Sequence, residues 1–275
     1  MSNSLELLNN QVDSDIASLS GWLAANKIAL NADKTKLFKS KRRSQLANFE
    51  LSLPGGKKIQ PSTHIKYLGV ILDENLSWQH HIHSLSIKLR RANEALCKLR
   101  HYVPHSVLLN VYHALFSSHM RYNCQAFGLA NNYISNRIYV LQKAAVRIMT
   151  FSPFRAHSSP LFARLKILKI FDLVKVLNIL FVHQVLNDNV PDKVRSYFQF
   201  TIKKHEYYTR ECESGCLIIP KVKTNSYGIN SLSYQSISTW NSLSRIYVNS
   251  IDTQFAKRKY SDLKKLVIVH FSNYN

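Results

Sequence analysis

The chain has 275 residues, which is enough for one or two domains because a single hydrophobic core usually serves roughly 100–200 residues. Hydrophobic residues make up 45% of the sequence and it has only 7 glycines and 7 prolines, a composition that excludes intrinsic disorder. Lys and Arg number 37 against 16 Asp and Glu, so the formal net charge of +21 predicts a surface that attracts a polyanion, most commonly nucleic acid.

The first predicted region, residues 1–75, is a small α+β part. Ser14 or Asp15 is expected to cap a helix that ends near Lys27. The apolar face of this helix is expected to hold four residues: Ile16, Leu19, Trp22 and Leu23.

Short strands are predicted after this helix. Residues 28–30 and 35–38 alternate weakly between apolar and polar, whereas residues 49–53 alternate clearly and are expected to pair with residues 57–60 across a Pro-Gly-Gly turn. Residues 65–72 (IKYLGVIL) are predicted to form one buried strand in which Gly69 marks a bend or a close backbone approach.

The second region, residues 76–189, is predicted to be a helical bundle. Its clearest stripe of apolar residues is Leu85, Leu89, Ala92, Leu96, Leu99 and Val103. A second helix after Pro104 is expected to place six residues on one face: Val107, Leu108, Val111, Tyr112, Leu115 and Phe116. A third stripe is Ile134, Ile138, Leu141, Ala145 and Ile148. Residues 161–187 are apolar nearly all round, which predicts the central helix or helix pair of the bundle.

The third region, residues 190–275, is less regular and is predicted to be a tail. Residues 216–219 and 227–232 have β propensity, and Trp240 is expected to anchor a helix. A basic closing helix is expected to pack through Phe255, Tyr260, Leu263 and Leu266. The fold class is therefore mainly α, with a small N-terminal α+β part and an irregular C-terminal tail.

Acidic residues that would hold catalytic metal ions are scarce. Phosphoryl-transfer enzymes bind divalent ions with at least two clustered carboxylates. Asp13 and Asp15 are the one close aspartate pair, and their place at a predicted helix start favours capping over metal binding. Asp73 and Glu74 are predicted to lie in a turn, so we assign no catalytic residues.

Histidines and cysteines also do not form a complete metal site. His80, His81 and His83 lack a second segment of ligands, so surface histidines are expected. Cys212 and Cys216 have no second cysteine pair, so a zinc knuckle would be incomplete and thiols are expected. No metal-binding residues are therefore assigned.

Several short strings occur in a specific order. The first three are Trp22-Leu23-x-x-Asn26-Lys27-x-x-Leu30-Asn31-x-x-Lys34-Thr35-Lys36, Ile65-Lys66-Tyr67-Leu68-Gly69-Val70-x-Leu72-Asp73 and Leu76-x-Trp78-x-x-His81-Ile82. Downstream are Leu141-Gln142-Lys143-Ala144-Ala145-x-Arg147-Ile148, Ser159-Pro160-Leu161-Phe162, Tyr208-Thr209-Arg210 and Trp240-Asn241-Ser242-Leu243. In this order and spacing they resemble the reverse transcriptases of non-LTR (LINE-type, jockey-like) retrotransposons, from the end of the palm through the thumb to the tail.

The resemblance implies roles for residues of the palm part. Lys34 falls in the palm motif whose lysine is thought to lie near the leaving pyrophosphate; the alternative is a solvated turn lysine. Lys66-Tyr67-Leu68-Gly69 resembles the primer-grip hairpin that holds the end of the growing strand, where Gly69 would let the backbone approach that strand. The alternative is a plain core strand with one lysine.

The resemblance also implies that residues 84–101 form a thumb helix. Its expected phosphate contacts are Lys88, Arg90, Arg91, Lys98 and Arg100, and such contacts give affinity with little sequence choice. The alternative is a solvated charged face without a partner.

One departure from the family pattern decides the expected function. The aspartate of the nucleotide-binding motif and the Tyr/Phe-x-Asp-Asp turn that precede the Trp-Leu-x-x-Asn-Lys string in such enzymes are missing, and Met1 begins just after them. We therefore expect a reverse-transcriptase fragment, from a truncated element or a partial gene, that grips primer and template but is inactive alone. No cofactor is expected on this chain, with magnesium bound only by the complete polymerase.

The expected partners are an RNA template and a DNA primer in an RNA–DNA hybrid, together with the missing upstream palm and fingers. No membrane partner and no small-molecule substrate are expected. Because no signal peptide and no bilayer-long apolar stretch are present, an intracellular protein, nuclear or cytoplasmic and not secreted, is expected. The alternative function is a stand-alone basic, helical nucleic-acid-binding protein without catalytic activity.

Overall fold

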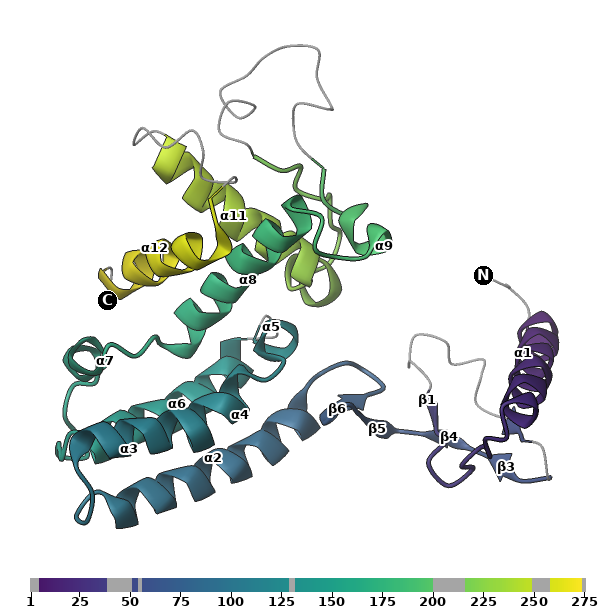
Figure 1. Cartoon of the computed structure of the whole chain (residues 1–275), viewed down its shortest axis with the longest axis horizontal. Coiled ribbons are helices and arrows are strands. Elements are labelled where there is room, and N and C mark those ends of the chain that lie inside the picture. The colour runs from purple at the N-terminus through teal and green to yellow at the C-terminus, as the bar shows by residue number, and fades with distance from the viewer. Residues whose placement is uncertain are drawn as a thin grey trace. The chain divides into compact units, whose positions relative to one another are not determined.

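The computed structural model describes residues 5–38, 51–53, 56–128, 132–199, 216–248 and 258–273 (Figure 1). Two compact units make up the chain, Met1–His81 and Ile82–Asn275. In these described ranges most residues are helical, and the strands are short and belong to the first unit. A mainly helical chain with a small N-terminal α+β part is therefore confirmed.

Helix α1 (Leu5–Ala25) begins earlier than predicted, because the apolar period that includes Ile16 runs back through Val12. Asp13 and Asp15 lie in mid-helix with exposed side chains, so their predicted capping role is wrong. Val12 and Ile16 pack against a small apolar cluster formed by Leu51, Leu53 and Ile59 in the first unit.

The predicted face of α1 is only partly right. Ile16 packs on the cluster and Leu23 is half-buried, whereas Leu19 and Trp22 are exposed. The described contact with the strands therefore uses the middle of the helix, at Val12 and Ile16.

In the part of the first unit that the structure describes, three two-stranded sheets follow α1. Strands β2 (Leu51–Ser52) and β3 (Lys58–Ile59) pair antiparallel, which confirms the predicted hairpin, although residues 49, 50, 54 and 55 lie outside the described part. Strands β1 (Leu37–Phe38) and β4 (Pro61–Ser62) pair in parallel. Residues 28–30 form no strand, contrary to the prediction.

The run predicted as one buried strand is a β-hairpin. Strand β5 (His64–Tyr67) pairs antiparallel with β6 (Val70–Asp73), and Tyr67 is opposite Val70. Leu68 and Gly69 have φ of +45° and +81°, the two positive values of a type I′ turn. The single strand expected from the apolar run is wrong because leucine, unlike asparagine, rarely adopts this conformation, so the apolar pattern did not signal a turn. The resemblance to the primer-grip hairpin did imply a hairpin at these residues.

The second unit contains most of α2 and the helices after it. Their bounds are α2 (Gln79–Leu99), α3 (His105–Val111), the π-helix η2 (Tyr112–Ser117), α4 (Ser118–Arg121), α5 (Cys124–Phe127) and α6 (Asn132–Met149). Four members of the first predicted stripe are buried: Leu85, Leu89, Ala92 and Leu96. Of the second predicted face, Leu108, Tyr112 and Phe116 are buried, whereas Val107 of α3 and Leu115 of η2 are exposed.

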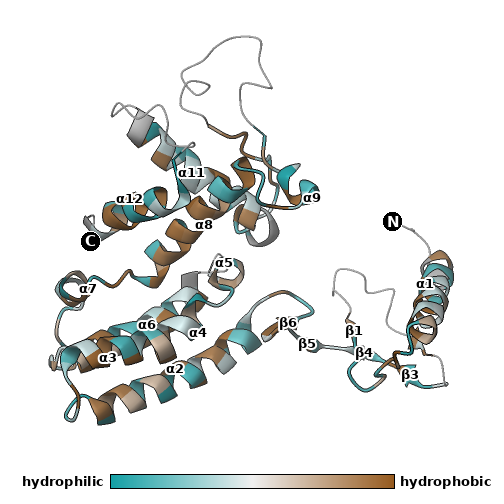
Figure 2. Ribbon diagram, viewed as in Figure 1, coloured by the Kyte–Doolittle hydropathy of each residue, from teal (hydrophilic) through white to brown (hydrophobic). Residues whose placement is uncertain are grey.

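The apolar segment 161–187 is a helix pair, as predicted. Helix α7 (Ser159–Leu165) and helix α8 (Ile170–Leu186) are joined by a short link; α8 is largely hydrophobic (Figure 2), and ten of its 17 residues are buried. It packs against α6, α5, the short helix α9 (Asp192–Arg195), α11 (Leu232–Val248) and α12 (Tyr260–Asn273).

Gln142 of α6 connects this pair to the first helices of the unit. Its fully buried side chain donates to the carbonyl of Leu168 at 2.9 Å and accepts from the backbone N–H of Ile170 at 3.0 Å. Its amide nitrogen also lies 3.3 Å from the hydroxyl of Tyr112, whose pKa burial raises to about 12. These hydrogen bonds pair the carbonyl of Leu168 and the N–H of Ile170 at the junction between α7 and α8.

The C-terminal tail differs from the prediction at residues 227–232. These residues form the end of the π-helix η4 (Asn225–Ile229), a two-residue turn and the first residue of α11 rather than a strand. Trp240 is fully buried, which confirms the predicted anchor, and the side-chain amide of Asn241 bonds both the N–H and the carbonyl of Leu217 at 2.9 and 2.8 Å. Leu263 of α12 is buried as predicted, whereas Phe255 lies outside the described residues.

Candidate nucleic-acid interface

The tip of the β5–β6 hairpin holds the four predicted primer-grip residues. Lys66, Tyr67, Leu68 and Gly69 are all exposed, with 61% of Tyr67 and 72% of Leu68 accessible to solvent. One aromatic ring and one apolar side chain therefore project beside a lysine at the end of a two-stranded ribbon. Their predicted contact with a primer is not tested by this geometry and stays a prediction.

The base of the hairpin is fixed by Asp73. Its buried carboxylate accepts hydrogen bonds from the backbone N–H groups of Asn75, Ser77 and Trp78 at 3.1, 2.9 and 3.0 Å, and from the Ser77 hydroxyl at 3.2 Å. The loop that carries these groups leads directly into α2. A residue that the sequence indicated only as part of a turn therefore determines how the hairpin is joined to the helix.

His81 supports the hairpin from the first turn of α2. Its imidazole Nδ1 accepts from the N–H of Ile71 at 3.4 Å, and its ring meets Trp78 edge-on at 6.4 Å between centroids. His81 is buried, so the expectation of a surface histidine is wrong for it, whereas His80 and His83 are exposed.

The outer face of α2 carries exposed cations. Lys88, Arg91 and Lys98 are separated by three and seven residues, so they share one face of the helix over about 15 Å. Arg90 is also exposed but projects from another side. Glu94 is the one acidic residue of the helix, and the positive charge therefore dominates this surface.

Arg100 differs from the other predicted phosphate ligands. It follows the last residue of α2 and is half-buried, and its guanidinium carbon lies 5.1 Å from the centre of the Phe151 ring. Its Nε also donates to Nε2 of His101 at 3.1 Å. Arg100 therefore does not belong to the exposed row of cations formed by Lys88, Arg91 and Lys98.

Lys34 lies in an exposed turn after α1. Its backbone N–H bonds the side-chain oxygen of Asn31 at 3.1 Å and the carbonyl of Asn31 at 3.2 Å. The neighbouring Asp33 pairs with Lys57, and this hydrogen bond and charge lower the pKa of Asp33. The geometry agrees with a turn lysine, and the role implied by the family motif stays a prediction.

Within the described ranges, no group of three or more His, Cys, Asp or Glu side chains is arranged to hold a metal ion. Cys97, Cys124 and Cys216 carry thiols rather than disulfides, and Cys212 lies outside the described part.

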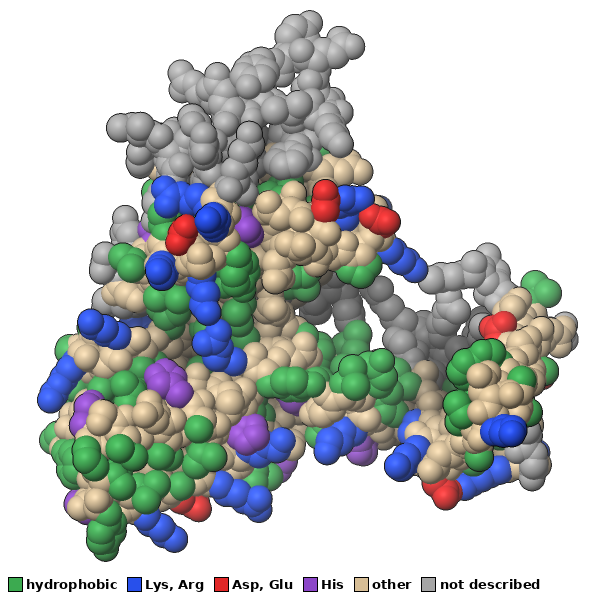
Figure 3. All heavy atoms as spheres, viewed as in Figure 1, with side chains coloured by type: hydrophobic (Ala, Val, Ile, Leu, Met, Phe, Trp, Pro, Cys, Tyr) green, Lys and Arg blue, Asp and Glu red, His purple; other side chains and the backbone are tan. Residues whose placement is uncertain are grey.

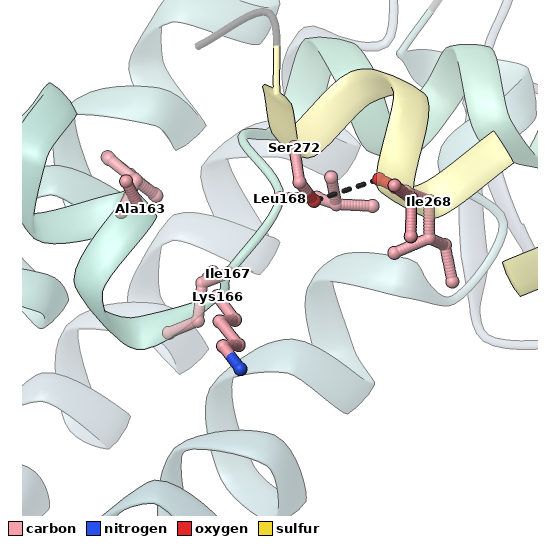
Figure 4. A pocket seen from close by; sticks show the side chains of 8 residues that line it. Ala163, Lys166, Ile167, Leu168, Ile268 and Ser272 are labelled. Carbon is pink, nitrogen blue, oxygen red and sulfur yellow. Dashed lines mark hydrogen bonds between the residues drawn. The ribbon is translucent and has the colours of Figure 1, made fainter. Parts of the chain in front are cut away.

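A cavity of about 430 Å³ lies between the α7–α8 link and α12 (Figure 4). Its lining is Phe162, Ala163, Lys166, Ile167, Leu168, Ile268, Val269 and Ser272. These side chains include one cation and no carboxylate, histidine or cysteine, so the cavity has no acid–base pair. In the described part of the chain, no helix is long and apolar enough to cross a membrane.

Comparison with known proteins finds two retrotransposon polymerases to which the chain is similar. It is 28% identical over 160 residues to the "Probable RNA-directed DNA polymerase from transposon X-element" of Drosophila melanogaster, a match that covers 56% of the chain and 17% of that protein. The resemblance to jockey-like retrotransposon reverse transcriptases is confirmed. The chain is also 27% identical over 124 residues to the "RNA-directed DNA polymerase from mobile element jockey" of Drosophila funebris, with 44% of the chain and 13% of that protein covered.

The chain spans less than a fifth of the length of these two relatives. No protein-family model matches the chain. No solved structure matches it either.

Proposed function

We propose that the chain is the primer–template-holding part of a retrotransposon RNA-directed DNA polymerase. The observation that carries this proposal is the similarity to two such polymerases over about half of the chain. In this assignment residues 1–75 are the end of the palm, residues 76–189 are the thumb and residues 190–275 are the tail. The ligand is an RNA–DNA hybrid.

The basic face of α2 would contact the phosphates of the hybrid. Lys88, Arg91 and Lys98 extend over about 15 Å, which is roughly four steps of 3.4 Å along one nucleic-acid strand. Because Lys and Arg bind phosphates without reading bases, the face suits an enzyme that must accept every template sequence. Figure 3 shows many more Lys and Arg than Asp and Glu side chains on the face in view.

The hairpin tip would contact the end of the primer. Tyr67 offers a ring that can pack on a sugar or a terminal base, and Lys66 offers a charge for the adjacent phosphate. Gly69 has no side chain to keep the strand away from the backbone. The Asp73 hydrogen bonds fix the loop at the base of this hairpin.

Polymerisation would need groups that these 275 residues do not supply. Nucleotide transfer uses two metal ions held by clustered aspartates, and the family's Asp-Asp turn is missing from the sequence. The chain alone is therefore proposed to be inactive, and magnesium and the assistance of Lys34 belong to the complete polymerase.

The primer-grip role is tested with a fluorescent hybrid whose DNA 3′ end is recessed, compared with a blunt hybrid of the same sequence. The double variant Tyr67→Ala, Leu68→Asn removes the ring and the apolar tip, while asparagine keeps the turn. We expect the wild-type preference for the recessed hybrid to disappear. The control Ile28→Asn changes another exposed apolar residue of the first unit and should keep the preference. An unchanged preference in the double variant would refute the primer-grip role.

Catalytic inactivity is tested by primer extension with template, nucleotides and magnesium. We expect no incorporation above a control without protein. Incorporation that depends on the purified chain would show that the proposal is wrong on this point.

A further inference from the structure

A second surface with nucleic-acid chemistry lies where α2 ends and α3 begins, beside the loop between α6 and α7. Both loops belong to the second unit. Six residues define this stacking surface: Arg100, His101, Tyr102, Phe151, Phe154 and Arg155. In Figure 3, hydrophobic side chains gather at the end of the unit where α2 ends.

The two loops meet through aromatic contacts. The Arg100 guanidinium lies over the face of Phe151 at 5.1 Å, and the ring of His101 meets Phe151 edge-on at 5.5 Å and 77°. A cation over a ring is attracted by the negative potential of its face. The Arg100–Phe151 contact therefore shows that a cationic planar group can lie against the ring of Phe151.

The α6–α7 loop is held in a single shape. Phe151 has φ of +54°, a conformation that a bulky residue adopts only when its surroundings impose it. The Ser152 N–H donates to the carbonyl of Arg147 at 3.0 Å, and the Arg147 Nε donates to the carbonyl of Ala156 at 3.0 Å. Because the loop is ordered before any ligand arrives, its rings are presented at a small entropic cost.

Two rings of the surface are almost fully open to solvent. Tyr102 is 85% and Phe154 is 86% exposed, and Phe151 is exposed over more than half of its area. Exposed single apolar residues are common, but three rings on two touching loops beside cations are a patch that indicates a binding site.

The charge of the two loops is entirely positive. Residues 98–106 and 147–158 contain no Asp or Glu, and their Lys and Arg residues are Lys98, Arg100, Arg147 and Arg155. His101, His105 and His157 add groups that become cationic when protonated. The ligand for this surface is therefore a polyanion that also offers flat apolar faces.

We propose that the stacking surface binds single-stranded nucleic acid without sequence preference. Every base has a face that stacks on an aromatic ring, and the phosphates of the same strand neutralise the cations. A duplex does not fit as well, because its bases are already stacked on each other and present only edges. This inference goes beyond the proposed grip on the hybrid, since it concerns strand outside the duplex and does not depend on the hairpin or on Lys88 and Arg91.

The test is fluorescence anisotropy of the full chain with an oligothymidylate and, separately, with a blunt RNA–DNA hybrid. The double variant Tyr102→Ala, Phe154→Ala removes the two most exposed rings, which have few contacts to lose. We expect its affinity for the oligothymidylate to fall by about 10-fold or more, because stacking contributes roughly 1–3 kcal/mol per base. Affinity for the hybrid should change by less than about 2-fold.

Two further variants distinguish this surface from general charge. Tyr197→Ala removes an exposed ring elsewhere in the second unit and should leave oligothymidylate binding unchanged. Lys88→Ala with Arg91→Ala should weaken the hybrid more than the oligothymidylate. The proposal is overturned if Tyr102→Ala, Phe154→Ala leaves oligothymidylate affinity intact, or weakens the hybrid equally.

Discussion

Asp73 shows how one buried side chain holds together segments that lie close in the sequence. It accepts four hydrogen bonds from three residues, and two nearby residues, Leu76 and Trp78, have positive φ of 51° and 64°. Such backbone conformations cost about 1–3 kcal/mol each and persist only when other contacts impose them. The carboxylate supplies those contacts.

Asp73→Ala should therefore loosen this loop. Removing the acceptor leaves buried N–H groups without a partner, at a cost of roughly 1–3 kcal/mol. We expect amide hydrogen exchange at Ser77 and Trp78 to accelerate about 5-fold to 100-fold. Asp13→Ala, which alters an exposed aspartate of α1, is the control, and equal exchange in both variants would argue against the role of Asp73.

Cys124 and Cys97 provide a second prediction for single residues. Cys124 is fully buried, and burial raises the pKa of its thiol to about 12, so at neutral pH it is protonated and shielded from reagents. Cys97 is exposed on α2. Iodoacetamide followed by peptide mass spectrometry should label Cys97 and leave Cys124 unmodified until the protein is unfolded. Labelling of Cys124 as fast as Cys97 in the native protein would contradict the described packing.

Single residues differ in how far the sequence predicted them. The exposure of Lys66 and Lys88 follows from their charge, whereas the buried bonding of Asp73 and Gln142 depends on partners brought close by folding. For Asp73 one signal was available, since an aspartate commonly accepts hydrogen bonds from the backbone of the turn that follows it, and its partners lie within five residues. Gln142 offered no such signal, because its partners lie up to 30 residues away.

Among the elements, the β5–β6 hairpin has a testable weakness. Leu68 occupies the first central position of a type I′ turn at φ of +45°, where asparagine is favoured and leucine is strained. Leu68→Asn should stabilise the hairpin by roughly 0.5–1 kcal/mol, whereas Leu68→Val should destabilise it. Hydrogen exchange at Val70 should slow in the first variant and accelerate in the second. The opposite order would show that the turn is not of this type.

The elements that the sequence predicted best are those with one continuous apolar stripe. Helix α2 and helix α6 bury their predicted faces because each packs along one side only, and α8 was recognised as central because it is apolar all round. The predictions failed where the period changes, as in the π-helix η2. They also failed at residues 227–232, where Gly228 comes so close to Val222 that an added Cβ would lie 2.7 Å from the Cβ of Val222.

On the scale of the whole molecule, the net charge of +21 was a first indication of a polyanionic partner. The structure distributes part of that charge over α2 and over the stacking surface, and the two relatives that the chain matches are RNA-directed DNA polymerases. Composition alone could not predict where the positive charge lies on the surface, because that depends on which face of each helix is buried. The resemblance to a polymerase family came from the order and spacing of short sequence motifs, which composition does not record.

The central claim is that exposed cations of α2 bind the phosphates of an RNA–DNA hybrid. Its most direct test is the dependence of the hybrid dissociation constant on salt, compared between wild type and Lys88→Ala, Arg91→Ala, Lys98→Ala. Each phosphate contact contributes about 0.9 to the negative log–log slope of the association constant for B-DNA, with a similar contribution expected for the hybrid. We predict a steep slope for the wild type that becomes shallower by about 2 to 3 in the triple variant. A flat wild-type slope, or a triple variant with the same slope as the wild type, would contradict the account.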